Sequence, residues 1–277
     1  MVEEHTDDLD GQPLFWRSAG ALDGTPTLYL HGVPTSSDDW VPFLEAGGGL
    51  APDLPGFGRS GKRGDGDFTM EGYAAFVDRF LEHMGVDRVR LVVHDWGAVG
   101  LLWAMRDPAR VERLVVMNAV PFLPGFTWHR AARLWRTRGI GEFAIGLASA
   151  KPVMGAALRG AAPGLRDEIL AHFDQGTQRA ILQLYRTSPP EKLAAAGADL
   201  GSITAPALVL WGADDPFIET RFASGYAAAL GDAELELVEG AGHWPWRDDP
   251  ALVARVCAFL GTRDAGSAAL PDPSRLV

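Results

Sequence analysis

Five short apolar runs, separated by longer segments of helical periodicity, constrain the fold of this chain more than any other feature. The runs are TLYLHG at 27–32, RVRLVVHD at 88–95, VERLVVMNA at 111–119, PALVLWGAD at 206–214 and AELELVEG at 233–240. Between them lie amphipathic segments such as TMEGYAAFVDRFLEHMG at 69–85, in which Thr69 suits a helix start and Gly85 its end. This alternation predicts an α/β fold with a mostly parallel central sheet flanked by helices.

The alternation stops between residues 121 and 203, where helical pieces broken by Gly and Pro follow one another. An insertion of that length between two strands predicts a helical cap over one end of the sheet. We therefore expect a core at 12–120 and 204–262, a cap at 121–203, and tails at 1–11 and 263–277.

Charge and composition exclude several classes of function. The chain has 277 residues and a net charge of -11, so a nucleic-acid partner is not expected. The arginines in HRAARLWRTR at 129–138 are interpreted as a solvated helix face. No apolar run reaches the ~20 residues of a membrane span, and the acidic start MVEEHTDDLD does not resemble a signal peptide, so we expect a cytoplasmic protein.

The single cysteine, Cys257, lies in the helical pattern ALVARVCAFL and is expected to be buried. One cysteine provides neither an internal disulfide nor a thiolate metal cage. We expect no metal and no cofactor.

Chemically capable side chains follow four of the predicted strands. These are His31 in HGVP, Asp95 after LVVH, Asp214 with Asp215 after LVLWGA, and His243 after LELVEGAG. Ligands of open parallel sheets gather at the carboxyl ends of the strands, so these residues are the candidates for an active site.

The order of nucleophile, acid and histidine along the chain resembles that of α/β-hydrolases, with Asp95 where a serine usually stands. The segments YLHGVPTSSDDW, APDLPGFGRSG, VVHDWGA, WGADDPFI and GAGHW together resemble the aspartate-nucleophile branch of the α/β-hydrolase fold, over about residues 12 to 262. That branch includes haloalkane dehalogenases and epoxide hydrolases. The resemblance implies the α/β-hydrolase fold, with the cap inserted between strands 6 and 7.

A carboxylate nucleophile suits attack on a saturated carbon, because it is already ionised at neutral pH. The expected intermediate is an alkyl ester on Asp95, hydrolysed by a water that His243 activates. The resemblance places the orienting acid at Asp215 rather than Asp214. By position, the backbone N–H groups of Trp96 and Val33 form the oxyanion hole.

Epoxide hydrolases and haloalkane dehalogenases differ in the leaving group that the enzyme must stabilise. An epoxide oxygen needs a proton from an acid such as Tyr185, in the cap segment ILQLYRTSPP, which resembles that of epoxide hydrolases. A halide needs weak donors such as the indoles of Trp96 and either Trp128 or Trp135, because Val33 stands where many dehalogenases carry an asparagine.

The leading prediction is an epoxide hydrolase acting with water on a small hydrophobic substrate to give a vicinal diol. A haloalkane dehalogenase is the alternative, and a catalytically silent ligand-binding protein of the same fold is a lesser one. The sequence leaves the oligomeric state open.

Overall fold

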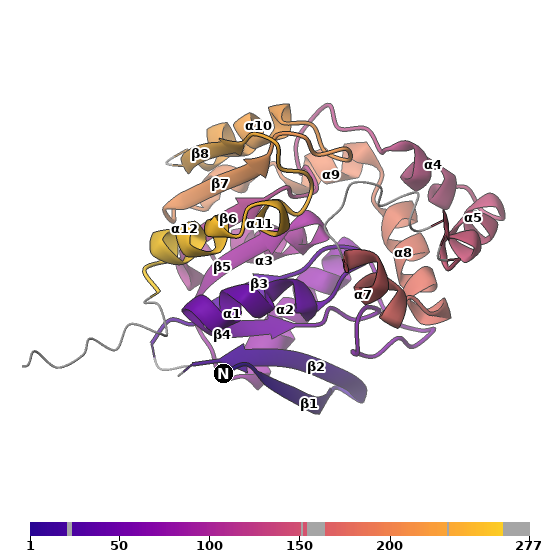
Figure 1. Cartoon of the computed structure of the whole chain (residues 1–277), viewed down its shortest axis with the longest axis horizontal. Helices are drawn as coiled ribbons and strands as arrows, with labels where there is room; N and C mark the ends of the chain where they lie inside the picture. The colour runs from indigo at the N-terminus through magenta and orange to yellow at the C-terminus, as the bar shows by residue number, and fades with distance from the viewer. Residues whose placement is uncertain (21–23, 151, 154–163, 232, 263–277) are drawn as a thin grey trace, which may run out of the picture.

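A single mixed sheet organises the computed structural model, which describes residues 1–20, 24–150, 152–153, 164–231 and 233–262 (Figure 1). The eight strands lie in the order β1-β2-β4-β3-β5-β6-β7-β8. They are β1 (Glu3–Leu9), β2 (Gln12–Ala19), β3 (Thr27–Leu30), β4 (Gly49–Pro52), β5 (Val89–His94), β6 (Val111–Met117), β7 (Ala207–Gly212) and β8 (Ala233–Val238). The pairs β1-β2 and β2-β4 are antiparallel, and the pairs from β4 to β8 are parallel.

The five apolar runs form β3, β5, β6, β7 and β8 of the parallel part, each ending one or two residues earlier than predicted. Every residue of β3 and of β7 is buried. Helices cover both faces of the sheet at these two strands, which explains why β3 and β7 are continuously apolar, whereas the edge strand β8 alternates and is largely exposed. The predicted α/β-hydrolase fold is confirmed.

The sequence pattern did not reveal β1, β2 and β4. Residues 3–9, which we expected in a tail, form β1 and pair with β2 along the whole strand, so that expectation was wrong. Six of the seven β1 residues are polar and most are exposed, so backbone pairing rather than an apolar face holds this edge strand. The predicted tail at 263–277 lies outside the described residues.

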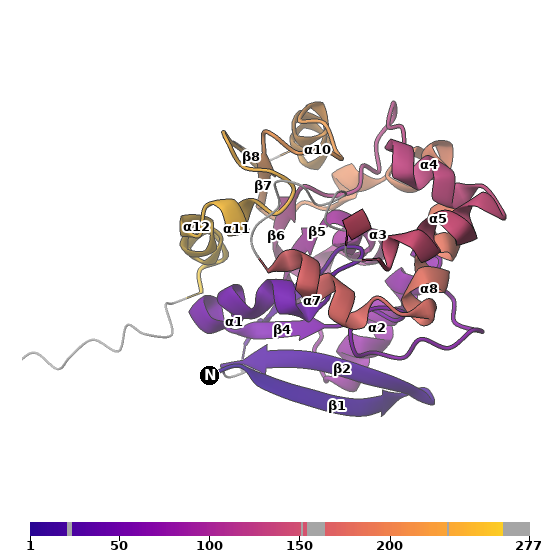
Figure 2. The ribbon, with the colours of Figure 1, turned by 45° about the vertical axis from the view of Figure 1, so that its right-hand side comes forward.

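Helices pack on both faces of the sheet (Figures 1 and 2). On one face α2 (Met70–His83), α3 (Val99–Arg106) and α10 (Arg221–Leu230) cover side chains such as Leu91 and Val93. On the other, α1 (Val41–Gly47) and α12 (Ala251–Leu260) cover Val92. The short elements are η1 (Ser37–Trp40), η2 (Asp95–Ala98), η3 (Pro108–Arg110), η4 (Leu200–Ser202) and α11 (Pro245–Asp248).

Two details of these helices match the sequence. Thr69 caps α2 by accepting a hydrogen bond from the Gly72 N–H at 3.1 Å, and Cys257 is buried in α12, as predicted. Across the described ranges, no helix combines the length and the apolar composition needed to cross a membrane.

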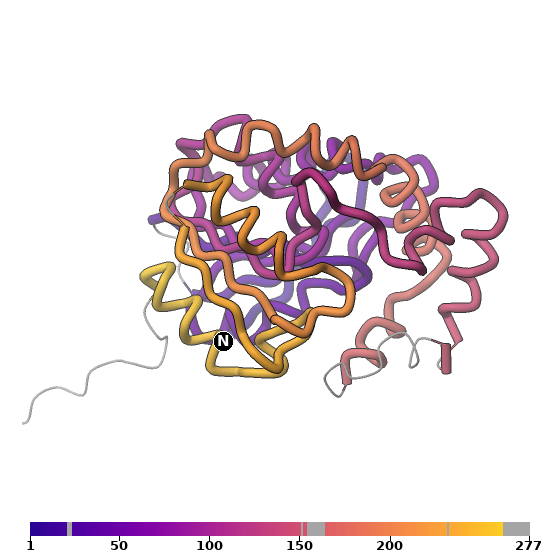
Figure 3. Tube along the Cα trace, turned by 90° about the horizontal axis from the view of Figure 1, so that it is seen from above, coloured from indigo at the N-terminus to yellow at the C-terminus, as the bar shows by residue number. Residues whose placement is uncertain are grey.

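The chain between β6 and β7 is helical throughout its described residues. It contains α4 (Arg130–Arg136), α5 (Ile140–Ala148), α7 (Leu165–His172), α8 (Gln175–Thr187) and α9 (Pro190–Ala196). Helices α4, α5, α7 and α8 lie together beside one end of the sheet in two views (Figures 1 and 3). This arrangement agrees with an inserted helical cap, although its predicted limits at 121 and 203 stay a prediction.

Candidate active site

Asp95 occupies the turn between β5 and α3, where the backbone is left-handed, with φ of 48°. A side chain in that region is strained by ~1 kcal/mol or more, and such strain is concentrated at functional sites. The turn is tightly packed. A Cβ added to Gly97 would collide with the Leu30 carbonyl oxygen, and one added to Gly32 would lie 2.7 Å from Asp95 Oδ1. Glycine at both positions therefore lets the carboxylate stand at the end of β5.

His243 lies between the carboxylates of Asp95 and Asp215. Its Nε2 is 3.5 Å from Asp95 Oδ2, and its Nδ1 is 2.7 Å from Asp215 Oδ2. Asp95 and His243 are 7% and 5% exposed, so water scarcely screens these interactions. The acid beside His243 is Asp215 and not Asp214, and the three side chains come from the ends of β5, β7 and β8.

Asp215 is held in place by donors on both carboxylate oxygens. Its Oδ1 accepts hydrogen bonds from the backbone N–H groups of Phe217 at 2.7 Å and Ile218 at 3.1 Å. Its Oδ2 also accepts one from Asn118 Nδ2 at 2.7 Å, and Asn118 Oδ1 accepts the Gly212 N–H at 3.0 Å. Asn118 follows β6 and was not predicted as a site residue. The sequence signal that could have identified Asn118 is its position directly after the apolar run LVVM.

The imidazole of His243 and the carboxylates of Asp95 and Asp215 stabilise one another in their charged forms. Burial alone raises the pKa of Asp95, but the hydrogen bond and charge of His243, with smaller contributions from His94 and the Val33 N–H, bring it below its usual value. Burial likewise opposes the ionisation of Asp215, and His243 again outweighs it, so the pKa of Asp215 is also lowered. The two carboxylates overcome the effect of burial on His243 and raise its pKa. Both carboxylates are therefore ionised at neutral pH.

Two backbone groups, the Val33 N–H and the His243 carbonyl, make hydrogen bonds within the site. The Val33 N–H donates to Asp95 Oδ1 at 2.7 Å, so it points at an oxygen of the carboxylate. His94 Nε2 bonds to the carbonyl oxygen of His243 at 2.7 Å. Burial, followed by the effect of His243, lowers the pKa of His94 to about 3, so this side chain is a neutral donor that fixes the His243 backbone.

A cavity of about 120 Å³ opens at Asp95 and His243. Its walls are mainly apolar and aromatic, and they include Val33, Val120, Phe126, Trp128, His129, Trp135, Ile181, Tyr185, Phe217 and Trp244. The residues Trp128, His129, Trp135 and Tyr185 all come from the helical segment between β6 and β7. The structure thus brings the predicted cap residues to the same cavity as Asp95.

Tyr185 is the centre of an aromatic cluster in that cavity. Its ring lies 5.4 Å from the Trp96 ring, 4.7 Å from that of Trp128 and 5.2 Å from that of Trp135. Within the described residues, no carbonyl or carboxylate accepts a hydrogen bond from its hydroxyl. Burial, together with the charge of Asp95, raises its pKa, so the phenol stays protonated.

Of the three indoles around Tyr185, Trp128 and Trp96 differ in their hydrogen bonding. Trp128 Nε1 donates to the Ser188 carbonyl oxygen at 3.1 Å, which commits its only donor to the protein. Trp96 Nε1 is buried and donates to no carbonyl or carboxylate of the described residues, and it lies near enough to the Tyr185 hydroxyl to lower the pKa of that phenol slightly. Of these two predicted leaving-group donors, only Trp96 has an N–H that is not committed to a backbone carbonyl.

His129 is a cavity residue that the sequence reasoning missed. It immediately precedes α4, and its Nδ1 accepts the Ala132 N–H at 3.4 Å as a helix cap. Its ring lies 5.4 Å from Phe217, which lies 5.1 Å from the His243 ring. The sequence offered no separate signal for it, because it was grouped with the neighbouring arginines as a solvated face.

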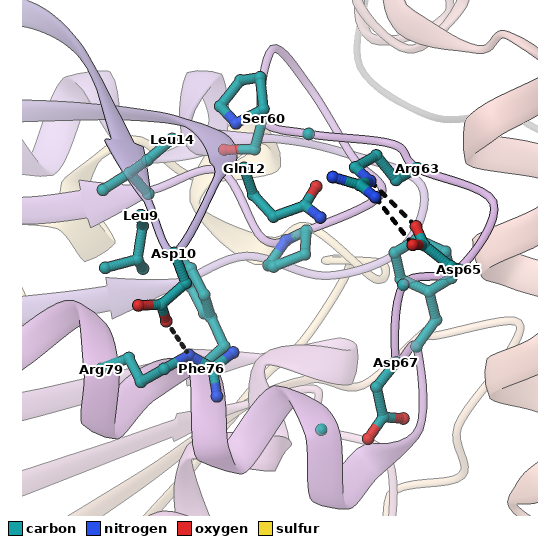
Figure 4. A pocket seen from close by; sticks show the side chains of 16 residues that line it. Leu9, Asp10, Gln12, Leu14, Ser60, Arg63, Asp65, Asp67, Phe76 and Arg79 are labelled. Carbon is teal, nitrogen blue, oxygen red and sulfur yellow. Dashed lines mark hydrogen bonds and ion pairs between the residues drawn. The ribbon is translucent and has the colours of Figure 1, made fainter.

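A second cavity, of about 290 Å³, lies beside the turn of the β1-β2 hairpin and the start of α2 (Figure 4). Four of its charged groups pair with each other, Arg79 with Asp10 at 3.1 Å and Arg63 with Asp65 at 2.9 Å, and Asp67 accepts a hydrogen bond from the Thr69 hydroxyl at 2.6 Å. It shares no lining residue with the cavity at Asp95. No group of three metal-binding side chains occurs in the part of the chain that the structure describes.

Comparison with known proteins agrees with this geometry. Residues 28–256 match the model of the alpha/beta hydrolase family. A haloalkane dehalogenase of Mycolicibacterium paratuberculosis (strain ATCC BAA-968 / K-10) is 33% identical over 76% of this chain and 74% of its own. A cis-3-alkyl-4-alkyloxetan-2-one decarboxylase of Xanthomonas campestris pv. campestris is 29% identical, over 94% and 96% of the two chains. Epoxide hydrolase 2 of Caenorhabditis elegans is 28% identical, over 84% and 73%.

Solved structures show the same fold. The haloalkane dehalogenase DbeA from Bradyrhizobium elkani USDA94 superimposes with a TM-score of 0.80 and 27% identity, covering 94% of this chain and 98% of that one. The similarity therefore extends over both the sheet and the helical segment that follows β6.

Proposed function

Since this chain belongs to the alpha/beta hydrolase family and is an enzyme of that fold, we propose that it hydrolyses small hydrophobic epoxides to vicinal diols. The observation that carries the proposal is the presence of a protonated phenol, Tyr185, in the same cavity as the ionised carboxylate of Asp95. Ring opening of an epoxide needs both groups, because one attacks carbon while the other protonates the leaving oxygen.

In the first step a carboxylate oxygen of Asp95 forms a bond to an epoxide carbon, and the bond from that carbon to the ring oxygen breaks. The electron pair goes to the oxygen, which takes the phenolic proton of Tyr185. The product is an ester on Asp95 that carries a β-hydroxyl group. The raised pKa of Tyr185 keeps its proton available, and the lowered pKa of Asp95 keeps the nucleophile ionised.

The second step uses His243 as a base. Conversion of Asp95 to a neutral ester removes one of the two negative charges that raise the pKa of His243, so the imidazole gives its proton through water to the Tyr185 phenolate and becomes able to accept one from the hydrolytic water. The resulting hydroxide attacks the ester carbonyl, and the Val33 N–H stabilises the oxyanion. On collapse the added hydroxyl gives its proton to the departing alkoxide, which releases the diol and the Asp95 carboxylate, and His243 keeps the proton that it took from water and so returns to its starting state.

The walls of the cavity support a neutral, apolar substrate. Aromatic and aliphatic side chains provide most of its lining, and its volume of about 120 Å³ suits a small molecule.

Haloalkane dehalogenation is the second candidate, because the buried N–H of Trp96, which follows Asp95 in sequence, is committed to no carbonyl or carboxylate of the described residues and suits a halide. A second halide donor is harder to find. Val33 has no side-chain donor, and the Trp128 N–H is committed to Ser188, which leaves Trp135.

The test is a paired product assay on the purified protein. Diol release from short aliphatic and aryl epoxides is compared with bromide release from bromoalkanes of matched size, using Asp95→Asn as the inactive control. Diol without bromide supports the proposal. Bromide without diol contradicts it and favours the second candidate.

A further inference from the structure

His129 carries a hydrogen-bond donor whose position is fixed by the fold. Its Nδ1 accepts the Ala132 N–H at the start of α4, and a nitrogen that accepts a hydrogen bond carries no proton. In a neutral imidazole the proton then resides on Nε2. The helix cap therefore selects the tautomer with a free Nε2–H.

The environment of His129 keeps it neutral. Burial is the largest influence and lowers its pKa, and the nearby charges of Asp95 and Asp215 offset this effect only in part. Within the described residues, Nε2 has no hydrogen-bond partner, although the ring lines the cavity at Asp95. A donor without a protein acceptor, in the cavity that also holds a nucleophile, is available to a bound molecule.

His129 belongs to the same wall of the cavity as Tyr185. The two ring centroids are 6.5 Å apart, and Trp135 packs against both at 5.9 Å and 5.2 Å. Both residues lie in the helical segment between β6 and β7, whereas Asp95 lies at the end of β5. The wall thus presents two neighbouring donors, one phenolic and one imidazole.

We propose that His129 Nε2–H is the second donor to the oxygen that leaves the epoxide carbon, acting beside Tyr185. This proposal rests on the proposed epoxide hydrolysis. As the carbon–oxygen bond breaks, Tyr185 transfers its proton to the oxygen. The His129 proton stays on nitrogen and stabilises the developing negative charge through a hydrogen bond. Trp128 does not fill this role, because its N–H already bonds to Ser188.

The test separates this role from the capping of α4. His129→Asn retains a residue type favoured at helix N-caps but is too short to present a donor at the position of Nε2. His129→Phe keeps an aromatic ring at this position but provides neither the helix cap nor the Nε2–H donor. Each is made in the His243→Gln background, where ester formation on Asp95 is the last step, and the ester is measured against time by intact-protein mass spectrometry.

Both variants are expected to form the ester at least ~10-fold more slowly than the His243→Gln parent, the low end of what an oxyanion donor contributes. His129→Asn should melt at the parental temperature. The matched control is His172→Asn, since His172 lies in α7 and does not line this cavity, and it should leave the rate unchanged.

A parental rate for His129→Asn would show that His129 only caps the helix and would overturn the proposal. NMR of the imidazole nitrogens gives a second readout, and a proton on Nδ1 in the wild-type protein would also overturn it. If instead the parent forms no ester with any epoxide, the proposed function itself fails, and the role of His129 in epoxide opening fails with it.

Discussion

Replacement of Tyr185 by phenylalanine should slow ring opening while leaving the protein folded. The change removes only the hydroxyl, which no carbonyl or carboxylate of the described residues accepts, so it strands no protein acceptor. A hydrogen bond to a developing charge is worth about 1.5 to 3 kcal/mol. At about 1.4 kcal/mol for each factor of ten, this corresponds to a rate loss of about 10-fold to 150-fold. Loss of full general acid catalysis would extend it to about 10⁴-fold.

The assay is ester formation on Asp95 in the His243→Gln background, where hydrolysis cannot obscure the first step. Tyr73→Phe is the matched control, because the buried Tyr73 hydroxyl donates to the Pro55 carbonyl oxygen at 3.0 Å and does not line the cavity. It should lose about 1 kcal/mol of stability and keep its rate. A Tyr185→Phe rate within threefold of the parent would refute the assignment of Tyr185 as proton donor; that limit is roughly 0.6 kcal/mol, below any hydrogen bond to charge.

Three further outcomes follow from the contacts of the site. Gly97→Ala should destabilise the protein by at least ~1 to 3 kcal/mol, because its Cβ would collide with the Leu30 carbonyl, and urea unfolding measures the loss. Asn118→Ala removes a donor from Asp215, so the same measurement should show a loss of ~1 to 3 kcal/mol, and ester hydrolysis should slow. The pKa of His243 is raised in the folded state, so its contribution to stability is complete below about pH 6.5 and is lost as pH rises toward about 10. Unfolding free energies measured against pH should decline over that interval, and His243→Gln should remove this part of the slope.

Four strands of the parallel part, β3, β5, β6 and β7, were readable from the sequence because they are largely buried on both faces. Runs such as LVLW in β7 are short and continuously apolar, which is typical of a strand buried on both faces. The edge strand β1 was not predicted, for the opposite reason. Its sequence EEHTDDL has no apolar face, and its partner β2 supplies the backbone hydrogen bonds that define it.

The part of the candidate site that was predicted consists of residues that directly follow predicted strands. Asp95, Asp215 and His243 each follow such a strand, so topology alone brings them to one edge of the sheet. Topology does not place the cap residues in the same way, because a rotation of a cap helix by one residue changes which of its side chains faces the cavity. Sequence therefore grouped Trp128 with Trp135 as possible donors, and only the bond from Trp128 to Ser188 distinguishes them.

His129 shows the same limit. Nothing in HRAARLWRTR separates the first residue from the arginines that follow it. Its position depends on where α4 begins and on which ring nitrogen accepts the Ala132 N–H, and both are properties of the folded cap.

The most direct test of the account is the mass of the His243→Gln protein after mixing with an epoxide that the wild-type protein converts to diol. The account predicts a stable increase equal to the mass of the epoxide, located on Asp95 by peptide mapping and absent when Asp95 is also changed to Asn. An unmodified His243→Gln protein, or an adduct on another residue, would contradict an ester mechanism through Asp95.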